Sequence, residues 1–223
     1  MIPLWRLNRG IMMAAAFTLY GVNFSGPTYK AALGLSLMEV PFDFVATFPR
    51  GNSKEPAYLK LNPLGQVPGL LDNKTGRFYR QAPSILEVLA DRTGKYGGQS
   101  AEERVEMREW MYWDLDRLAP PLYRMRGQRL GFRQFGQIVA EMYNSEGLAA
   151  LKALEDHFAE HKWLVGRRSS IADIDIYAVL EFAAAGGFEI RDFPNVEAYM
   201  RRFQDLKGFG RPADVIPKDS RKV

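Results

Sequence analysis

The residue pattern changes between the first and second parts of the chain, and this change restricts the fold more than any other feature. Strand-like and helical segments alternate at first: Phe17–Tyr20, a helix opened by Ser25, and a second strand at Phe42–Thr47. Strand–helix–strand order is typical of two parallel strands joined by a crossover helix. Only helical patterns follow from Ser100 onwards. The sequence therefore predicts an α/β domain followed by an all-α domain.

Turn and capping residues predict the remaining elements of the first domain. Val67–Asp72 and Arg77–Tyr79 flank a turn that contains Asp, Asn and Gly, which predicts a hairpin. Pro83 then predicts the first turn of a helix that ends near Asp91. We therefore expect an N-terminal extension at 1–16, an α/β domain at 17–91, a glycine-rich linker at 92–99 and a helical domain at 100–223.

Three signals predict where helices of the helical domain begin or are interrupted. Ser100 and Glu103 have the spacing of a capping box and predict the start of a long helix. Pro120–Pro121 should kink or interrupt that helix, because proline has no backbone N–H. Ser170 and Asp173 predict another helix start, ahead of an apolar run.

Composition excludes several kinds of chemistry. The chain has no cysteine, so it can form neither disulfides nor thiolate metal sites, and any thiol that reacts must belong to a ligand. A net charge of +4 suits small anionic ligands but is too weak to indicate nucleic acid. No apolar run is long enough for a transmembrane helix, so we expect a cytoplasmic protein without a membrane partner.

The first residues allow two interpretations. Arg6 and Arg9 precede the apolar stretch Ile11–Ala16, which faintly resembles a signal peptide. The stretch is short and leads directly into the first expected strand, so we favour an N-terminal extension. In that case translation could start at Met1, Met12 or Met13.

The most specific motif is Asn62-Pro63-Leu64-Gly65-Gln66-Val67-Pro68-Gly69-Leu70. A cis bond before Pro68 would present the backbone N–H and C=O of Val67 to a peptide-like ligand, as an added strand would. Alone, the stretch could be an ordinary Pro/Gly turn. It resembles the Asn-Pro-x-Gly-x-Val-Pro-x-Leu signature of the glutathione transferase superfamily, in which the second proline is cis and opens a thioredoxin-like strand.

Further segments resemble the same family in order and spacing. Tyr20–Pro27 is similar to the first strand and active-site loop of the serine-type classes, such as phi and theta. The others are Phe78–Asp91, Trp163–Gly166 with Ser170–Ile174, and Phe193–Phe209. The resemblance implies a thioredoxin-like N-terminal domain, an all-α C-terminal domain, a two-fold homodimer, and binding of glutathione as co-substrate with no metal.

The resemblance also implies roles for particular residues. Ser25 would donate a hydrogen bond to the glutathione thiolate, with Asn23 and Thr28 as substitutes; the alternative is that Ser25 only caps a helix. The residues that would hold the tripeptide are Lys54 and Gln66 at its glycyl end, Val67 through its backbone, and Gln81 and Ala82 at its γ-glutamyl end. Ala82 departs from the family's usual serine, so the hydroxyl contact to the γ-glutamyl carboxylate is missing and only the backbone N–H can donate.

The second substrate would be a small, electrophilic and apolar molecule. Trp110 and Trp113, with nearby arginines, could form its wall; the alternative is ordinary helix packing. His157 and His161 match a zinc-peptidase spacing, but the chain has no third histidine. We therefore expect a glutathione transferase. The alternatives are another glutathione-dependent reaction (ether or halide cleavage, isomerisation, peroxide or disulfide reduction) or a non-catalytic interaction module.

Overall fold

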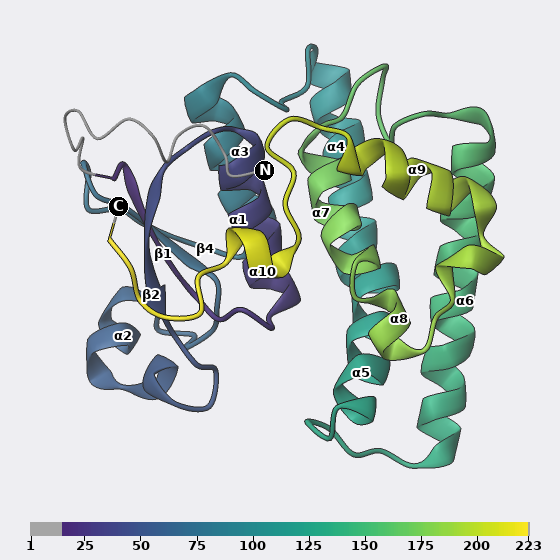
Figure 1. The fold of residues 1–223 in the computed structure, drawn as a ribbon, viewed down its shortest axis with the longest axis horizontal. Helices are drawn as coiled ribbons and strands as arrows, with labels where there is room; N and C mark the ends of the chain where they lie inside the picture. Colours follow the sequence, from purple (N-terminus) through teal and green to yellow (C-terminus); the bar gives the residue numbers. More distant parts are fainter. Residues whose placement is uncertain (1–14, 223) are drawn as a thin grey trace. The chain divides into compact units, whose positions relative to one another are not determined.

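The computed structural model describes residues 15–222. Most of the expected N-terminal extension, including the alternative starts at Met12 and Met13, lies outside the described residues. The described chain forms two compact units (Figure 1). One unit contains residues 15–93 together with 206–222, and the other contains Gly94–Asp205.

The first unit is built on a four-stranded mixed sheet with the order β2-β1-β3-β4. β1 (Phe17–Gly21) pairs in parallel with β2 (Phe42–Ala46), and α1 (Gly26–Leu37) is the crossover helix between them. On its other side β1 pairs antiparallel with β3 (Gly69–Asp72), which forms a hairpin with β4 (Phe78–Arg80). The expected strand–helix–strand unit and hairpin are confirmed.

Alternation along β1 divides the sheet into two faces. Leu19 is fully buried, and α1 packs beside α3 (Ala82–Thr93) on that face (Figure 1). Tyr20 points to the opposite face, where its ring lies 5.7 Å from that of Tyr58 in α2 (Pro56–Leu61). Tyr20 thus packs against Tyr58 on this face.

The last residues pack differently from the expectation that 100–223 form the helical domain. Residues 206–222 pack on the first unit, where α10 (Pro212–Val215) lies against α1. The Tyr29 hydroxyl donates to the Gly210 carbonyl over 2.9 Å. Phe44 of β2 and Arg221 exchange two backbone hydrogen bonds. The exposed edge of β2 thus provides backbone hydrogen-bond partners for the extended segment around Arg221. The sequence of that segment does not have the alternating pattern that predicts a strand.

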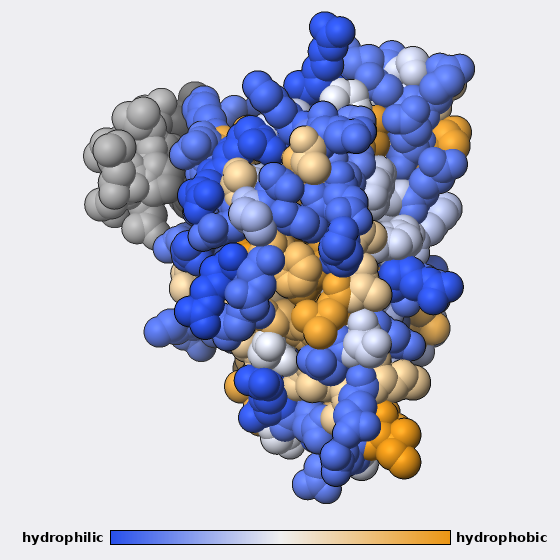
Figure 2. All heavy atoms as spheres, turned by 90° about the vertical axis from the view of Figure 1, so that its right-hand side faces the viewer, coloured by the Kyte–Doolittle hydropathy of each residue, from blue (hydrophilic) through white to orange (hydrophobic). Residues whose placement is uncertain are grey.

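The second unit is helical throughout, and the bounds of its elements are α4 (Ala101–Trp113), a π-helical turn (Asp114–Leu118), α5 (Ala119–Arg129), α6 (Gln137–Glu160), α7 (Ile171–Leu180), α8 (Ala183–Gly186), a 3-10 turn (Ile190–Asp192) and α9 (Pro194–Gln204). The π turn interrupts the long helix directly before Pro120–Pro121, as expected, since neither proline can donate to a carbonyl one turn back. On the face of this unit in Figure 2, hydrophilic side chains surround a smaller apolar group. No helix within residues 15–222 is long and apolar enough to cross a membrane.

α7 begins at a buried capping box, which confirms the role expected for Asp173. Its carboxylate accepts from the Ser170 N–H over 2.8 Å, from the Ser170 hydroxyl over 2.9 Å and from the Leu164 N–H over 3.0 Å. Burial nevertheless raises the pKa of Asp173 to about 6, because desolvation outweighs these bonds.

Candidate functional site

A groove of about 380 Å³ opens on the first unit where α1 and α3 begin. It is lined by Ser25, Pro27, Pro49, Lys54, Asn62, Gly65, Gln66, Val67, Pro68, Gln81 and Ala82. Six of these are the residues for which the sequence predicted a role in binding or activating a tripeptide. Two helix N-termini at one groove favour an anionic ligand, because each helix has a partial positive charge at that end.

Ser25 caps α1 and still has a hydrogen atom to donate. Its side-chain oxygen accepts from the Thr28 N–H over 3.2 Å, and its side chain is half-buried at the groove. A serine hydroxyl can accept and donate at once, and the Ser25 hydroxyl donates to no group within residues 15–222. Capping the helix and donating to a ligand are therefore compatible roles for this side chain.

The suggested substitutes for Ser25 do not reach the groove. Thr28 is fully buried, and its hydroxyl oxygen accepts from the Val22 N–H over 3.4 Å. Asn23 does not line the groove either. Pro27 has no N–H, so the first-turn amide of α1 that remains for a ligand is that of Gly26.

The Asn-Pro-x-Gly motif fixes the loop that carries Gln66. The Asn62 side-chain amide donates to the Gln66 carbonyl over 2.8 Å, and the Tyr58 hydroxyl donates to the same oxygen over 2.6 Å. Gly65 has a φ of 57°, a conformation that favours glycine, and its carbonyl accepts from Lys54 Nζ over 2.9 Å. Asn62 is 1% exposed, so it holds this loop in place from the protein interior.

The Val67–Pro68 peptide bond is cis, as the motif predicts. Pairing between β1 and β3 ends at Gly69, so the Val67 backbone lies beyond the end of that ladder and at the groove. This arrangement presents backbone polar groups of Val67 to a ligand that runs along the groove.

Gln81 has an unusual backbone conformation at the start of α3. Its φ is 68°, which is rare for a residue other than glycine and is found more often at functional sites. Its side-chain amide donates to Gln66 Oε1 over 3.2 Å. Ala82, the first residue of α3, is buried, and Pro83 beside it has no N–H. The Ala82 N–H is thus the first amide that α3 offers, and nothing in the sequence indicated the positive φ of Gln81.

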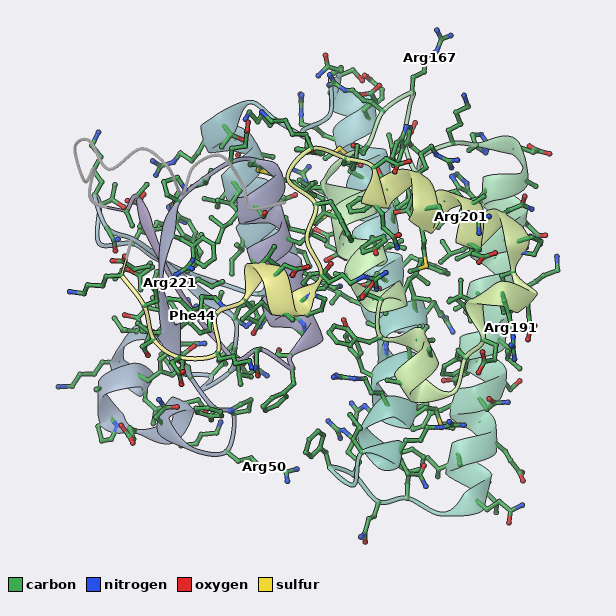
Figure 3. All side chains as sticks on the ribbon, viewed as in Figure 1. Phe44, Arg50, Arg167, Arg191, Arg201 and Arg221 are labelled. Atoms are coloured by element: carbon green, nitrogen blue, oxygen red, sulfur yellow. The ribbon has the colours of Figure 1, made fainter. Side chains whose placement is uncertain are left out.

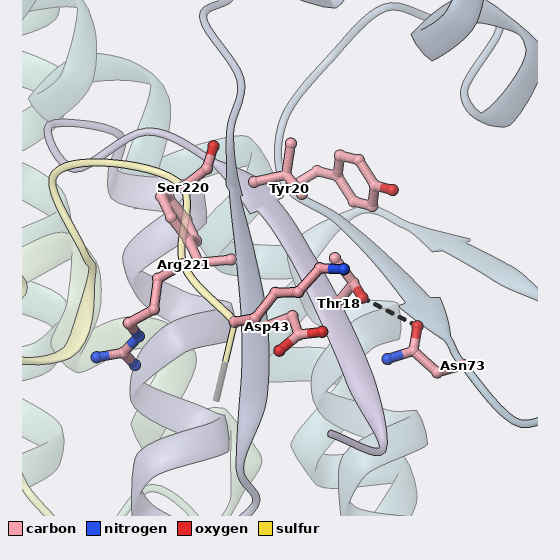
Figure 4. A pocket seen from close by; sticks show the side chains of 9 residues that line it. Thr18, Tyr20, Asp43, Asn73, Ser220 and Arg221 are labelled. Carbon is pink, nitrogen blue, oxygen red and sulfur yellow. Dashed lines mark hydrogen bonds between the residues drawn. The ribbon is translucent and has the colours of Figure 1, made fainter. Parts of the chain in front are cut away.

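A larger hollow of about 460 Å³ lies elsewhere on the first unit, beside β1, β2 and the C-terminal segment (Figure 4). Its lining includes Thr18, whose hydroxyl donates to Asn73 Oδ1 over 2.9 Å, and Asp43. None of the residues predicted to bind a ligand lines it. We place the site at the smaller groove, because six such residues and two helix N-termini meet there.

Trp110 and Trp113 lie in α4 of the helical unit. Their rings meet edge-on with 5.4 Å between centroids, and the Trp110 ring lies 4.8 Å from that of His157 in α6. Both tryptophans are half-buried. These contacts are typical of side chains that pack two helices together, so a role beside an electrophile stays a prediction.

The two histidines have structural partners. His157 Nε2 lies 3.1 Å from the Trp163 carbonyl, His161 Nδ1 lies 3.1 Å from the His157 carbonyl, and the two rings stack. Burial lowers the pKa of His157, which favours its neutral form. No group of three or more His, Asp or Glu side chains arranged to hold a metal occurs in the described part of the chain.

Two family models match the chain. The model described as "Glutathione S-transferase, N-terminal domain" matches residues 24–92, and "Glutathione S-transferase, C-terminal domain" matches residues 120–206. Together they cover more than half of the chain. The chain belongs to the glutathione S-transferase family. Its sheet unit and helical unit are the thioredoxin-like and all-α parts of that fold, so the predicted fold class is confirmed.

Curated relatives in this family carry two kinds of name. Over 193 residues the chain is 28% identical to "Probable elongation factor 1-gamma 1" of Arabidopsis thaliana, a match covering 84% of this chain and 46% of that protein. It is also 28% identical over 172 residues to "Glutathione S-transferase F9" of Arabidopsis thaliana, covering 70% of this chain and 75% of that protein. The chain thus spans about half the length of the elongation factor relatives it matches.

Solved structures agree with this family. A possible glutathione S-transferase from Rhodopseudomonas palustris is 30% identical with a TM-score of 0.82, covering 91% of this chain and all of that one. The glutathione transferase URE2P8 from Phanerochaete chrysosporium, solved with oxidized glutathione, has a TM-score of 0.83 over 92% of this chain and 96% of that one. At 21% identity, the second likeness concerns the fold alone.

Proposed function

We propose that this protein is a glutathione transferase that binds glutathione in the groove of its first unit and activates the thiol for attack on an electrophile. One observation carries the proposal: Ser25, Lys54, Gln66, Val67, Gln81 and Ala82 line a single groove. A structural neighbour that contains oxidized glutathione supports the choice of ligand.

The chemical task is to keep the bound thiol ionised. A thiol with a pKa of about 8.5 is only about 3% ionised at pH 7, and lowering the pKa by about two units, worth about 2.7 kcal/mol, makes most of it thiolate. The Ser25 hydroxyl would donate to the sulfur, and the positive end of α1, with the Gly26 N–H, would add to this effect. The thiolate sulfur then bonds to the electrophilic carbon and either adds to it or displaces its leaving group.

The rest of the groove would bind the two ends of the tripeptide. Lys54 would attract the glycyl carboxylate, and the Val67 backbone would pair with the peptide groups. Gln81 would accept from the γ-glutamyl ammonium, and the Ala82 N–H would donate to the neighbouring carboxylate. Without ligand, Gln81 and Gln66 bond to each other, so binding exchanges this bond for bonds to glutathione.

The electrophile and the assembly are further parts of the proposal. An apolar electrophile would contact Trp110 and Trp113.

A homodimer is supported by apolar side chains on the surface of α4, where Val105 is 52% exposed and Tyr112, seven residues on, is 64% exposed. Light scattering should give twice the chain mass at micromolar concentration, and a monomer there would contradict the dimer.

Two alternatives remain for the same fold. The groove would serve another glutathione-dependent reaction equally well, because thiolate activation is common to all of them. A non-catalytic interaction module is favoured by Ala82, which lacks the usual hydroxyl, and by the relatives named elongation factor 1-gamma. Binding of glutathione separates this module from the enzymes.

Calorimetry with glutathione, followed by a rate assay with 1-chloro-2,4-dinitrobenzene, tests the proposal. We expect submillimolar binding and a glutathione-dependent release of chloride that Ser25→Ala slows about ten- to a hundredfold, equivalent to about 1.4–2.7 kcal/mol. Ser36→Ala is a matched control, since it removes another serine hydroxyl of α1, which donates to the Gly208 carbonyl instead. Binding weaker than millimolar, with no conjugation, would favour the module.

A further inference from the structure

The backbone carbonyl of Gln66 is held by two side chains rather than by another part of the backbone. At the β2 edge of the same unit, the Phe44 carbonyl accepts from the backbone N–H of Arg221 over 2.8 Å, and the two residues lie side by side in Figure 3. The Gln66 carbonyl instead accepts from the Tyr58 hydroxyl over 2.6 Å and from the Asn62 side-chain amide over 2.8 Å. A substitution can therefore remove either bond without changing the backbone.

Both donors lie on one face of α2, on the interior side of the loop that carries Gln66. Tyr58 and Asn62 are one helical turn apart, and the Asn62 N–H donates to the Tyr58 carbonyl over 2.8 Å. The two residues are 6% and 1% exposed. A carbonyl oxygen has two lone pairs, and these two donors use both. The Gln66 carbonyl thus has no lone pair left for a ligand.

The direction of the Gln66 carbonyl also fixes the direction of the next N–H. In a trans peptide unit the C=O and N–H bonds point to opposite sides, and the Gln66–Val67 bond is trans, since the cis bond follows at Val67–Pro68. Because the carbonyl points inward to Tyr58 and Asn62, the Val67 N–H points outward, at the groove that Val67 lines. This N–H donates to no group within residues 15–222.

Packing around Tyr58 fixes the position of its hydroxyl group. The Tyr58 ring centroid lies 5.7 Å from that of Tyr20 and 6.1 Å from that of Phe78. Gly69 leaves the space for this arrangement, because a Cβ there would overlap the Phe78 ring and lie 3.1 Å from the Tyr58 hydroxyl oxygen. Burial raises the pKa of Tyr58, so the hydroxyl keeps at neutral pH the hydrogen that it donates.

We propose that Tyr58 is a positioning residue for glutathione, whose hydroxyl, together with the Asn62 amide, turns the Val67 N–H toward the ligand. The groove then offers a donor at this point and no acceptor from Gln66, so the ligand group beside it must be an acceptor such as a peptide carbonyl. Tyr58 does not line the groove and acts through the Gln66–Val67 peptide unit. The inference rests on the proposed function, since it takes glutathione as the ligand.

Tyr58→Phe tests the proposal, because it removes the hydroxyl and keeps the ring. Calorimetry should show glutathione binding about three- to tenfold weaker, and KM for glutathione should rise by a similar factor. Both kcat and the pKa of the bound thiol should stay unchanged, because Ser25 and α1 are not altered. Tyr20→Phe is the matched control: it removes a hydroxyl from the same group of rings, and that hydroxyl is not a donor to Gln66. Its affinity for glutathione should equal that of the wild type.

Carbon-13 NMR of the protein without glutathione tests the positioning bond itself. A carbonyl carbon resonates further downfield when its oxygen accepts a hydrogen bond, so the Gln66 resonance should move upfield in Tyr58→Phe and stay in place in Tyr20→Phe. An unmoved resonance would overturn the inference, whether or not glutathione binds.

The binding data separate this inference from the proposed function. If the wild type binds glutathione and Tyr58→Phe binds it equally well, the inference fails and the proposed function stands. An equal loss of affinity in Tyr20→Phe would assign the effect to packing, and a raised thiol pKa in Tyr58→Phe would place its action at the sulfur; either result overturns the positioning role. If the wild type does not bind glutathione, the proposed function itself fails and takes this inference with it.

Discussion

Ser25 and Ser170 occupy the same position in two helices, yet their hydroxyl groups have different partners. Each is the N-cap of its helix. The Ser170 hydroxyl is buried and donates its hydrogen to the Asp173 carboxylate over 2.9 Å. The Ser25 hydroxyl lines the groove, accepts from the Thr28 N–H and donates to nothing in residues 15–222.

This difference shows what separates a structural cap from a candidate catalytic one. Helix capping uses the oxygen of a serine and leaves its hydrogen for another partner. At Ser170 an acid three residues later takes the hydrogen, whereas α1 has no acid in its first turn. Four substitutions, two in each region, test the distinction.

Ser170→Ala should have the largest effect, and the effect should be on stability. It removes a buried cap and a hydrogen bond to a carboxylate, so the free energy of unfolding should fall by about 3–4 kcal/mol. Urea unfolding followed by circular dichroism measures this. Glutathione affinity of the folded protein should not change, and a loss of affinity as large as the loss of stability would break the contrast with Ser25.

The raised pKa of Asp173 predicts how pH acts on the same cap. A carboxyl group that binds its proton more tightly in the folded chain than in the unfolded chain stabilises the fold as pH decreases through its folded pKa. Between pH 7 and pH 4 the stability of the wild type, relative to Asp173→Asn, should therefore rise by up to about 3 kcal/mol, the equivalent of about two pKa units. If the stability relative to Asp173→Asn instead fell as pH decreases, the folded pKa of Asp173 would be lowered. The hydrogen bonds that stabilise the carboxylate would then outweigh the effect of its burial.

Ala82→Ser should place a hydroxyl group at the start of α3, as Ser25 does at the start of α1. A serine there could donate to the γ-glutamyl carboxylate beside the Ala82 N–H. Calorimetry should show glutathione binding about tenfold tighter, the lower end expected for a hydrogen bond to a charged group. The pKa of the bound thiol should not change, and unchanged affinity would place the γ-glutamyl end away from α3.

Gln81→Ala should have the smallest effect. It removes one neutral side chain at a half-open groove, so glutathione affinity should fall about threefold. Arg80→Ala is a matched control, because it truncates an exposed neighbour that does not line the groove. If Gln81→Ala raised the pKa of the bound thiol, Gln81 would lie near the sulfur and our orientation of the tripeptide would be reversed.

Much of the fold could be predicted because its signals are local. The capping residues Ser25 and Ser170, and the apolar strands from Phe17 and Phe42, each indicate their element within a few residues. The packing of residues 206–222 against α1 and β2 could not be predicted, since it depends on distant partners such as Phe44 and Gly210.

The candidate site was predictable to the extent that its residues belong to a motif. Lys54, Gln66 and Gln81 meet at one groove, as expected. Thr28 could not be excluded from sequence, because only the packing of α1 against β1 shows that its side chain is buried. The positioning role of Asn62 depends on a bond to the Gln66 carbonyl, which residue types alone do not indicate.

The central claim is that the Ser25 hydroxyl stabilises the glutathione thiolate, and the absorbance of bound thiolate against pH tests it most directly. In the wild type the pKa of bound glutathione should lie about two units below its free value, and Ser25→Ala should return most of that shift, while Ser170→Ala should not change it. An unchanged thiol pKa in Ser25→Ala would contradict the claim, and Ser25 would be a helix cap alone.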